Sequence, residues 1–156
     1  MNLDLKQKPL STQLMNNMKN SLPAGDYVIC DLCYVLEREW EEVCSLLFPE
    51  KNNPNQPLRN GVLTLKDGRK FAIYGTAWGD GTYTDNNGRL YAVDAGVIGC
   101  IAKKDLPNYK SGDRYIHETN FSEEFETGYD EGTIYFGDVR IDTDPDYDDV
   151  DYDDED

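Results

Sequence analysis

The sequence has a single histidine, His117, among its 156 residues, and it lacks the short motifs that mark common enzyme classes. It contains no G-x-x-x-x-G-K-[ST] phosphate loop, no G-x-G-x-x-G turn, no H-E-x-x-H zinc motif and no G-x-S-x-G nucleophile elbow. A serine–histidine–aspartate triad would have to use that one histidine. These absences favour a binding protein over an enzyme, and we predict neither a catalytic residue nor a cofactor.

Long apolar segments are also absent. No run approaches the roughly 20 apolar residues that a membrane-spanning helix needs. The first twenty residues, MNLDLKQKPLSTQLMNNMKN, lack the apolar stretch of a signal peptide. We therefore expect a cytoplasmic protein without a membrane partner. Its four cysteines are then expected to be reduced thiols.

Basic residues are scarce, because 31 acidic residues stand against 15 basic ones and give a net charge of −16. The last fifteen residues, DTDPDYDDVDYDDED, hold ten of the acids and no base, so residues 1–141 carry only −6. Like charges at this density repel, and little apolar area is present to offset the entropy of ordering. We expect residues 142–156 to be a disordered tail that repels nucleic acid and is attracted to basic surfaces. The acidic residues expected to make these contacts are Asp144, Asp146, Asp148, Asp149, Asp151, Asp153 and Asp154.

Three regions are expected along the chain. Residues 1–24 read as a polar extension with a short helix, 25–141 as one globular domain and 142–156 as the tail. The domain opens with an apolar run at 26–36 that is typical of a core strand. Residues 37–48 follow with Trp40, Val43, Cys44 and Leu47 at the spacing of one apolar helical face.

Short strand-like segments separated by turns fill the rest of the domain. The sequence predicts two hairpins, around KDG and DNNG. It also predicts one long strand over 89–102, with a bulge or a close backbone approach at Gly96 and Gly99, and further strands at 114–118 and 132–141. The total is six or seven strands with one convincing helix. The predicted class is α+β, mainly β: a twisted antiparallel sheet or partly closed barrel packed against the helix at about 37–48.

Two aspartates interrupt the most apolar segments of the sequence. Asp31 lies between Cys30 and Leu32, and Asp94 between Val93 and Ala95. A buried carboxylate needs a partner, so these two, with Asp80, could converge as a cation site or an acid/base pair. Alternatively, each caps a turn or bonds the backbone at a bulge. The candidate pocket comprises Asp31, Cys33, Tyr34, Trp78, Asp80, Tyr83, Tyr91 and Asp94.

The C-x-x-C at Cys30 and Cys33 suggests zinc or redox chemistry, with Cys44, Cys100 and His117 as further ligands. In a strand, however, Cys30 and Cys33 would point to opposite faces and would not chelate one ion. Buried thiols are the favoured interpretation, and no metal is predicted. A Cys33 nucleophile with His117 as its base is the remaining alternative.

Three stretches, GDYVICDLCYVL, YGTAWGDGTYTD and YAVDAGVIG, resemble a group of small uncharacterised proteins of bacteria and their phages. In that group a strand with a Gly-Asp-x-Cys-Tyr-like pattern precedes a Trp-bearing helix, and a Gly-Asp-Gly-x-Tyr turn leads into a Val-Asp-x-Gly strand. The resemblance covers about residues 25–101, with Cys30 in place of an expected glycine. It implies a phage or mobile-element context and no particular activity.

Together these features favour a non-enzymatic binding protein, encoded by a phage or mobile element, that acts in the host cytoplasm. Its acidic surface and tail would inhibit a basic host protein, such as a nucleic-acid-binding or defence protein, as a nucleic-acid mimic does. One alternative is a protein that sequesters a small molecule or nucleotide between Trp78, Tyr83 and Tyr91. Another is a small metal- or carboxylate-dependent hydrolase that uses Asp31, Asp80 and Asp94.

Overall fold

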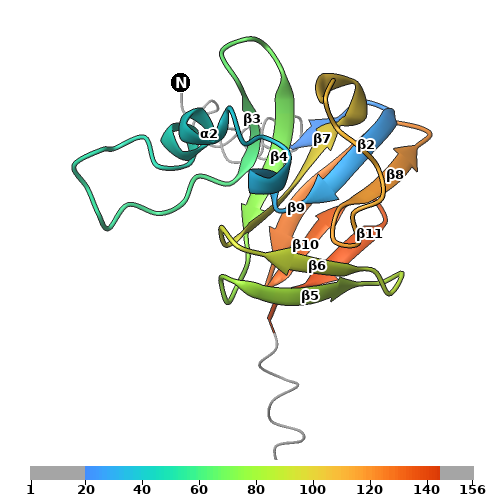
Figure 1. Ribbon diagram of the computed structural model, residues 1–156. Helices are drawn as coiled ribbons and strands as arrows, with labels where there is room; N and C mark the ends of the chain where they lie inside the picture. Colours follow the sequence, from blue (N-terminus) through green and yellow to red (C-terminus); the bar gives the residue numbers. More distant parts are fainter. Residues whose placement is uncertain (1–19, 145–156) are drawn as a thin grey trace, which may run out of the picture.

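The chain folds as two antiparallel β-sheets packed face to face (Figure 1). The computed structural model describes residues 20–144. The six-stranded sheet has the order β1 (Ser21–Leu22), β9 (Phe125–Asp130), β10 (Thr133–Phe136), β11 (Val139–Asp142), β5 (Gly81–Asp85) and β6 (Leu90–Val93). The five-stranded sheet has the order β3 (Gly61–Thr64), β4 (Lys70–Gly75), β7 (Val97–Ala102), β2 (Gly25–Cys30) and β8 (His117–Phe121). The predicted α+β, mainly β, class is confirmed, with two sheets that do not close into a barrel in place of one.

One apolar core lies between the sheets. In β10, Ile134 and Phe136 point into this core, whereas Thr133 and Tyr135 face outward, as the pleat of a strand requires. The five-stranded sheet supplies the opposite side of the core with Tyr27, Ile29, Ala72, Tyr74, Ile98 and Cys100. The six-stranded sheet therefore has one face buried in the core and one face open to solvent.

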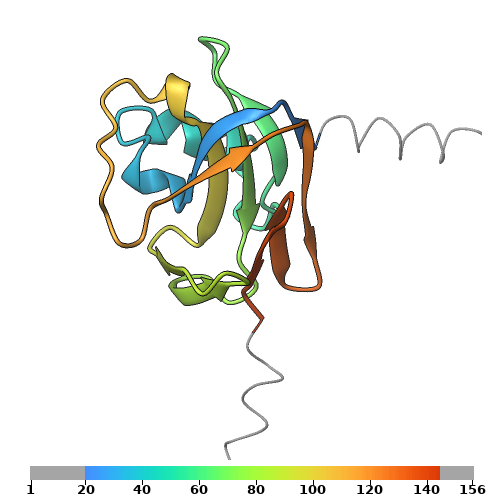
Figure 2. The same cartoon turned by 90° about the vertical axis from the view of Figure 1, so that its right-hand side faces the viewer.

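A second core covers the other face of the five-stranded sheet. Here the helix α2 (Trp40–Leu47) and the 3₁₀ turn η1 (Leu32–Tyr34) pack on Val28, Phe71 and Ile101. A second 3₁₀ turn, η2 (Lys103–Asp105), follows β7. Figure 2 shows the helical segments in cyan on one side of the five-stranded sheet and the orange-red strands of the six-stranded sheet on the other. Because both of its faces are covered, β7 is buried at all six positions, which explains its uninterrupted apolar sequence.

The helix agrees with its sequence pattern, since α2 lies within the predicted 37–48 and buries Val43 and Leu47. The preceding strand is shorter than predicted. β2 ends at Cys30, and residues 32–34 turn into η1 because the Asp31 side chain caps that turn by accepting the N–H of Cys33. The expected strand over 26–36 is therefore wrong in its second half.

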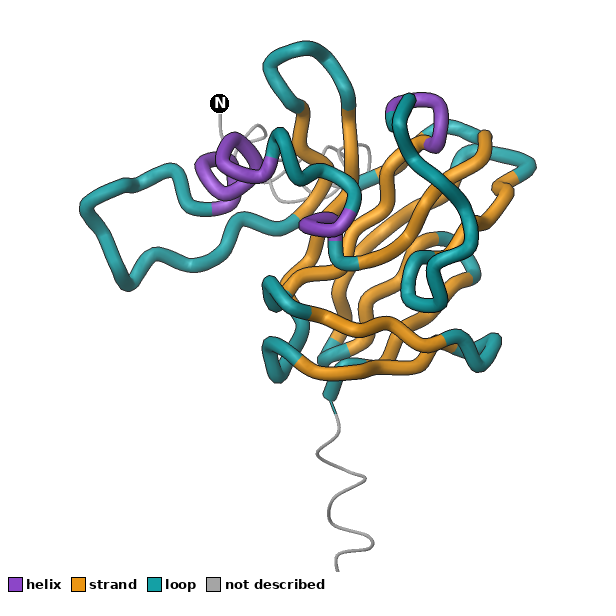
Figure 3. The backbone as a smooth tube through the Cα atoms, viewed as in Figure 1, coloured by secondary structure: helices purple, strands orange, loops and turns teal. Residues whose placement is uncertain are grey.

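The single long strand predicted over 89–102 is also wrong. β6 ends at Val93 in the six-stranded sheet, and β7 begins at Val97 in the five-stranded one, so residues 94–96 carry the chain from one sheet to the other (Figure 3). Gly96 permits this turn with a φ of +76°. Gly99 fulfils its predicted role, because a methyl group there would overlap the Leu32 side chain and the Ala72 carbonyl.

The predicted hairpins are β3–β4 and β5–β6, and the segment 132–141 forms the hairpin β10–β11. β9 was not predicted, and the folded region extends past 25–141 at both ends. Ser21 and Leu22 pair with β9, while Asp142 belongs to β11 and Thr143 is fully buried. The expected extension and tail otherwise fall at residues 1–19 and 145–156, outside the described residues. No helix within 20–144 has the length and apolarity to cross a membrane.

Candidate functional site

The eight residues of the predicted pocket do not form one cavity. Five of them, Asp31, Cys33, Tyr34, Asp80 and Asp94, lie where η1, the 94–96 turn and the loop 76–80 meet. Trp78 projects from that loop into solvent with 58% of its surface exposed. Tyr83 and Tyr91 belong to the core between the sheets. Neither of the two grooves described below is lined by any of the eight.

Asp31 holds η1 and the 94–96 turn together through hydrogen bonds. Its side chain is completely buried and accepts three backbone N–H groups, from Cys33 at 3.1 Å, Asp94 at 2.8 Å and Ala95 at 2.6 Å. It follows β2 directly, while Asp94 lies on an exposed bend, so neither aspartate lies inside a strand as predicted. Asp94 contacts the Asp31 carboxylate through its backbone N–H. The contact therefore fits the alternative in which Asp31 caps a turn, and it is not a pair of converging carboxylates.

Cys33 and Tyr34 stay protonated at neutral pH. Burial, helped by the neighbouring Asp31 carboxylate, raises the pKa of the Cys33 thiol to about 12. Burial and the nearby Asp94 raise the pKa of the Tyr34 hydroxyl to about 12. A thiol with such a pKa is a poor nucleophile, because the thiolate is the reactive form.

The cysteines of the C-x-x-C are free thiols, as are Cys44 and Cys100. Burial raises the pKa of Cys30 well above its usual value. Within residues 20–144, no three His, Cys, Asp or Glu side chains are grouped so that they could hold a metal ion. His117 contacts the Tyr91 ring at 4.6 Å between centroids and donates through Nε2 to the Leu90 carbonyl.

Tyr83 and Tyr91 have structural partners. Tyr83 donates its hydroxyl to the carbonyl of Gly79 at 2.9 Å, and the fully buried Tyr91 donates to Asp85 at 2.6 Å. Burial by itself raises the pKa of the Asp85 carboxyl, but hydrogen bonds from Tyr91, from Arg89 and from backbone N–H groups outweigh it and hold the pKa below its usual value. Asp85 had been predicted only as the first residue of the DNNG turn.

The Asp85 cluster also joins the free edges of the two sheets. Arg89 pairs with Asp85 at 2.9 Å and reaches across to the Glu118 carbonyl and the Thr119 hydroxyl of β8. The bond from His117 to Leu90 spans the same edge, between β8 and β6. Side chains thus close this side of the sandwich where no ladder of backbone hydrogen bonds exists.

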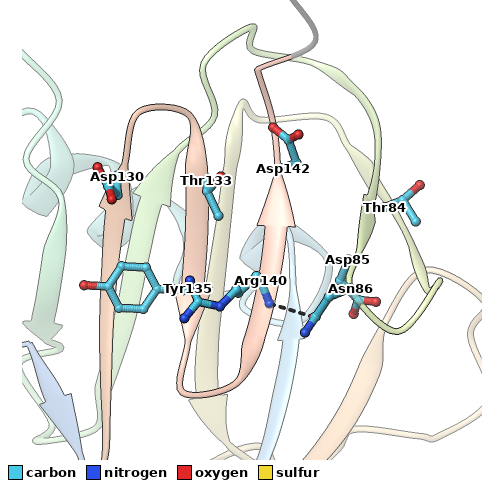
Figure 4. Close-up of a pocket in the computed structure, with 8 residues that line it drawn as sticks. All are labelled: Thr84, Asp85, Asn86, Asp130, Thr133, Tyr135, Arg140 and Asp142. Atoms are coloured by element: carbon cyan, nitrogen blue, oxygen red, sulfur yellow. Dashed lines mark hydrogen bonds between the residues drawn. The ribbon is translucent and has the colours of Figure 1, made fainter. Parts of the chain in front are cut away.

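The open face of the six-stranded sheet carries two adjoining grooves of about 390 and about 430 Å³. They share Tyr135 and Arg140, and Figure 4 shows these two side chains beside each other in the first groove. The Tyr135 ring lies over Gly128, where a methyl group would overlap it, and the Arg140 guanidinium stands 6.0 Å from the ring centre. This aromatic and cationic pair was not predicted, because it depends on the register of β10 with β11, which places Arg140 opposite Tyr135.

Acidic side chains surround these grooves. Between residues 121 and 144 the sequence has eight acidic residues and one basic residue, Arg140. Seven of the acidic side chains are exposed, and we call them the outer acidic face: Glu123, Glu124, Glu126, Asp130, Glu131, Asp138 and Asp142. Residues 20–144 contain 22 acids and 12 bases in all, so the folded region itself has a net charge of −10.

No protein family, curated protein or solved structure matches this chain. The resemblance to phage proteins therefore stays a prediction.

The predicted interaction tail is represented by its first member, Asp144, which follows the buried Thr143. Its carboxylate accepts the indole N–H of Trp78 at 3.4 Å. The structure thus connects one candidate pocket residue with the start of the tail. The other tail residues, Asp146, Asp148, Asp149, Asp151, Asp153 and Asp154, lie outside the described residues.

Proposed function

We propose that this protein is a non-enzymatic binding protein that recognises a positively charged surface of another protein. The observation that carries the proposal is the outer acidic face, whose seven exposed carboxylates lie between residues 121 and 144, a stretch with Arg140 as its single basic residue. Six of the seven line the two adjoining grooves of the six-stranded sheet. In the sequence, residues 145–156 add eight more acidic residues. A one-sided charge distribution of this kind attracts and orients a basic partner and repels the phosphates of nucleic acids.

The finer part of the proposal concerns the partner. A host nucleic-acid-binding or defence protein presents a basic groove that such a face would fill, as a nucleic-acid mimic does. This part is supported by the resemblance to phage proteins, and the acidic face is compatible with other basic partners of the same chemistry.

The alternatives have weaker support. The proposed hydrolase needs Asp31, whose carboxylate already accepts three backbone N–H groups and is completely buried. The proposed small-molecule pocket needs Tyr83 and Tyr91, whose rings lie in the core. An anionic nucleotide is also a poor ligand for the Tyr135 groove, because the surrounding carboxylates repel its phosphates.

The test compares two variants with the same change in net charge. The face variant carries Glu124→Gln, Glu126→Gln and Glu131→Gln. The control variant carries Glu37→Gln, Glu41→Gln and Glu50→Gln, three exposed residues outside the outer acidic face. Binding of a hexa-arginine peptide is followed by stopped-flow kinetics at about 50 and about 300 mM salt, where the Debye length shortens markedly.

We expect the face variant to associate about 3- to 10-fold more slowly than the wild type at low salt, and the control to stay within about twofold. The difference should shrink at high salt, because screening weakens attraction between exposed charges. Equal losses in the two variants would mean that only overall charge matters and would contradict the proposal. The absence of salt-dependent binding by the wild-type chain would also contradict it.

A further inference from the structure

Trp78 is the most exposed of the large apolar side chains in the described region. Its surface is 58% exposed, compared with 45% for Leu90, 42% for Tyr129 and 41% for Phe48. Tryptophan is enriched among the residues that dominate protein–protein binding energies, because it buries a large area when a partner covers it. Its exposure here, on the loop described next, makes it a candidate contact residue.

The loop that presents Trp78 is held in place on several sides. The Gly79 carbonyl accepts the hydroxyls of Thr76 at 2.7 Å and Tyr83 at 2.9 Å. The Ala77 N–H donates to the hydroxyl of the buried Thr143 at 2.9 Å. The indole is thus exposed on an ordered loop, so that a partner would not have to order the loop on binding.

A further contact extends this support to the neighbouring turn. The Thr76 N–H donates to the carbonyl of Gly96 at 3.0 Å, and Asp31 fixes the 94–96 turn from the core side. Figure 1 shows that the loop between β4 and β5 lies beside the point where the chain leaves β11. The exposed indole, the turn and the first residue of the acidic tail thus belong to one surface.

The charges around the indole are negative. Asp144 accepts the indole N–H, and Asp80 follows Gly79 on the same loop with an exposed side chain. A carboxylate oxygen of Asp80 lies near Gly96, two residues from the exposed Asp94. An aromatic ring face attracts a cation through its quadrupole, and nearby carboxylates add to this attraction.

We infer that Trp78 is the anchor residue of a docking surface for an arginine-rich segment of the partner protein. One guanidinium stacks on the indole face, while Asp80, Asp94 and Asp144 attract the flanking basic residues. Arginine fits this surface better than lysine, because its planar guanidinium is weakly hydrated and stacks on aromatic rings. The inference rests on the proposed function and adds to it a second contact site, next to the outer acidic face, where the Asp144 N–H donates to the Asp142 carboxylate at 3.1 Å. It also adds the chemistry of the segment that binds there.

The test uses the full chain and the same hexa-arginine peptide, with hexa-lysine for comparison. The chain has two tryptophans, Trp40 and Trp78, so a Trp40→Phe background leaves Trp78 as the only indole fluorophore. Trp78→Ala is compared with Phe48→Ala, a matched aromatic truncation at an exposed site in the C-terminal cap of α2. Trp78→Phe keeps an aromatic face, and urea unfolding of each variant verifies that it is folded.

We expect peptide binding to change the emission of Trp78 in a saturable way. Trp78→Ala, whose binding is measured by titration calorimetry because it lacks this fluorophore, should raise the dissociation constant about 3- to 30-fold, the range of a partly desolvated cation–π contact. Trp78→Phe should lose less, and Phe48→Ala should stay within about twofold of the wild type. The salt dependence of binding should be unchanged in Trp78→Ala, because no charge is removed.

Three results would contradict the inference, each in a distinguishable way. If binding depends on salt but Trp78→Ala and Phe48→Ala both weaken it only slightly and to the same extent, Trp78 is not the anchor and the proposed function still stands. Failure of the wild-type chain to bind hexa-arginine at low salt would remove the proposed function and the anchor with it. Equal or stronger binding of hexa-lysine would contradict the selectivity for guanidinium.

Discussion

Asp31 and Asp94 look alike in the sequence, but the structure predicts a much larger loss of stability for substitution of Asp31 than for substitution of Asp94. Asp31→Asn replaces a carboxylate that accepts three N–H groups by an amide with one acceptor oxygen and one donor nitrogen. If the amide oxygen keeps the N–H groups of Asp94 and Ala95, the amide nitrogen faces the N–H of Cys33, donor against donor. One charge-assisted hydrogen bond is worth about 1.5–3 kcal/mol, so we expect Asp31→Asn to lower the free energy of unfolding by about 2–4 kcal/mol.

Asp31→Ala should cost more, about 3–5 kcal/mol, because it removes all three bonds, although water can reach the exposed bend at 94–95. Asp94→Asn should cost less than about 1 kcal/mol, because its own side chain is exposed and only its backbone contacts Asp31. Urea unfolding at pH 7, followed by fluorescence, measures all three. Equal losses in the free energy of unfolding for Asp31→Asn and Asp94→Asn would refute this structural role of Asp31. An Asp31→Asn variant as stable as the wild type would refute it as well.

Two further predictions concern stability. The lowered pKa of Asp85 means that its contribution is present above about pH 4 and is lost as the pH falls through its folded-state pKa. Asp85→Asn should therefore lose about 2–3 kcal/mol at pH 7 and show a flatter decline in urea midpoint below pH 4; parallel acid profiles for mutant and wild type would contradict this. Gly99→Ala should lower the free energy of unfolding by about 2–3 kcal/mol, because the added methyl group overlaps the Ala72 carbonyl. Thermal unfolding measures this loss, and an unchanged midpoint would show that the backbone shifts enough to accommodate the methyl group.

Local patterns predicted several elements because their signals lie within a few residues. The helix at Trp40–Leu47 follows from apolar residues one helical turn apart, and the β5–β6 hairpin follows from the DNNG turn. The buried state of Asp31 was also suggested by its apolar neighbours. In each case the amino acids that determine the structure are close together in the chain.

The strand predicted over 26–36 was cut short by a local cap, the Asp31 side chain on the Cys33 N–H, whereas other errors occurred where distant segments decide the conformation. Residues 89–102 read as one apolar strand, but the 94–96 turn divides it because Asp31, more than sixty residues earlier, accepts two of its N–H groups. Asp85 reads as a turn residue, and its burial depends on Tyr91 and on the way Arg89 reaches β8. Hydrophobic periodicity carries no information about such partners.

The candidate binding surfaces divide in the same way. The amino-acid sequence alone determined the acidic character of the chain, the mainly β class and the concentration of acidic residues after Phe121, because composition and short-range periodicity are properties of the chain itself. Only the tertiary structure decided that six of these acids line two adjoining grooves of one sheet and that Trp78 lies against Asp144. These contacts arise because the β4–β5 loop and the end of β11 come together when the two sheets pack, and no pattern in either segment specifies the other.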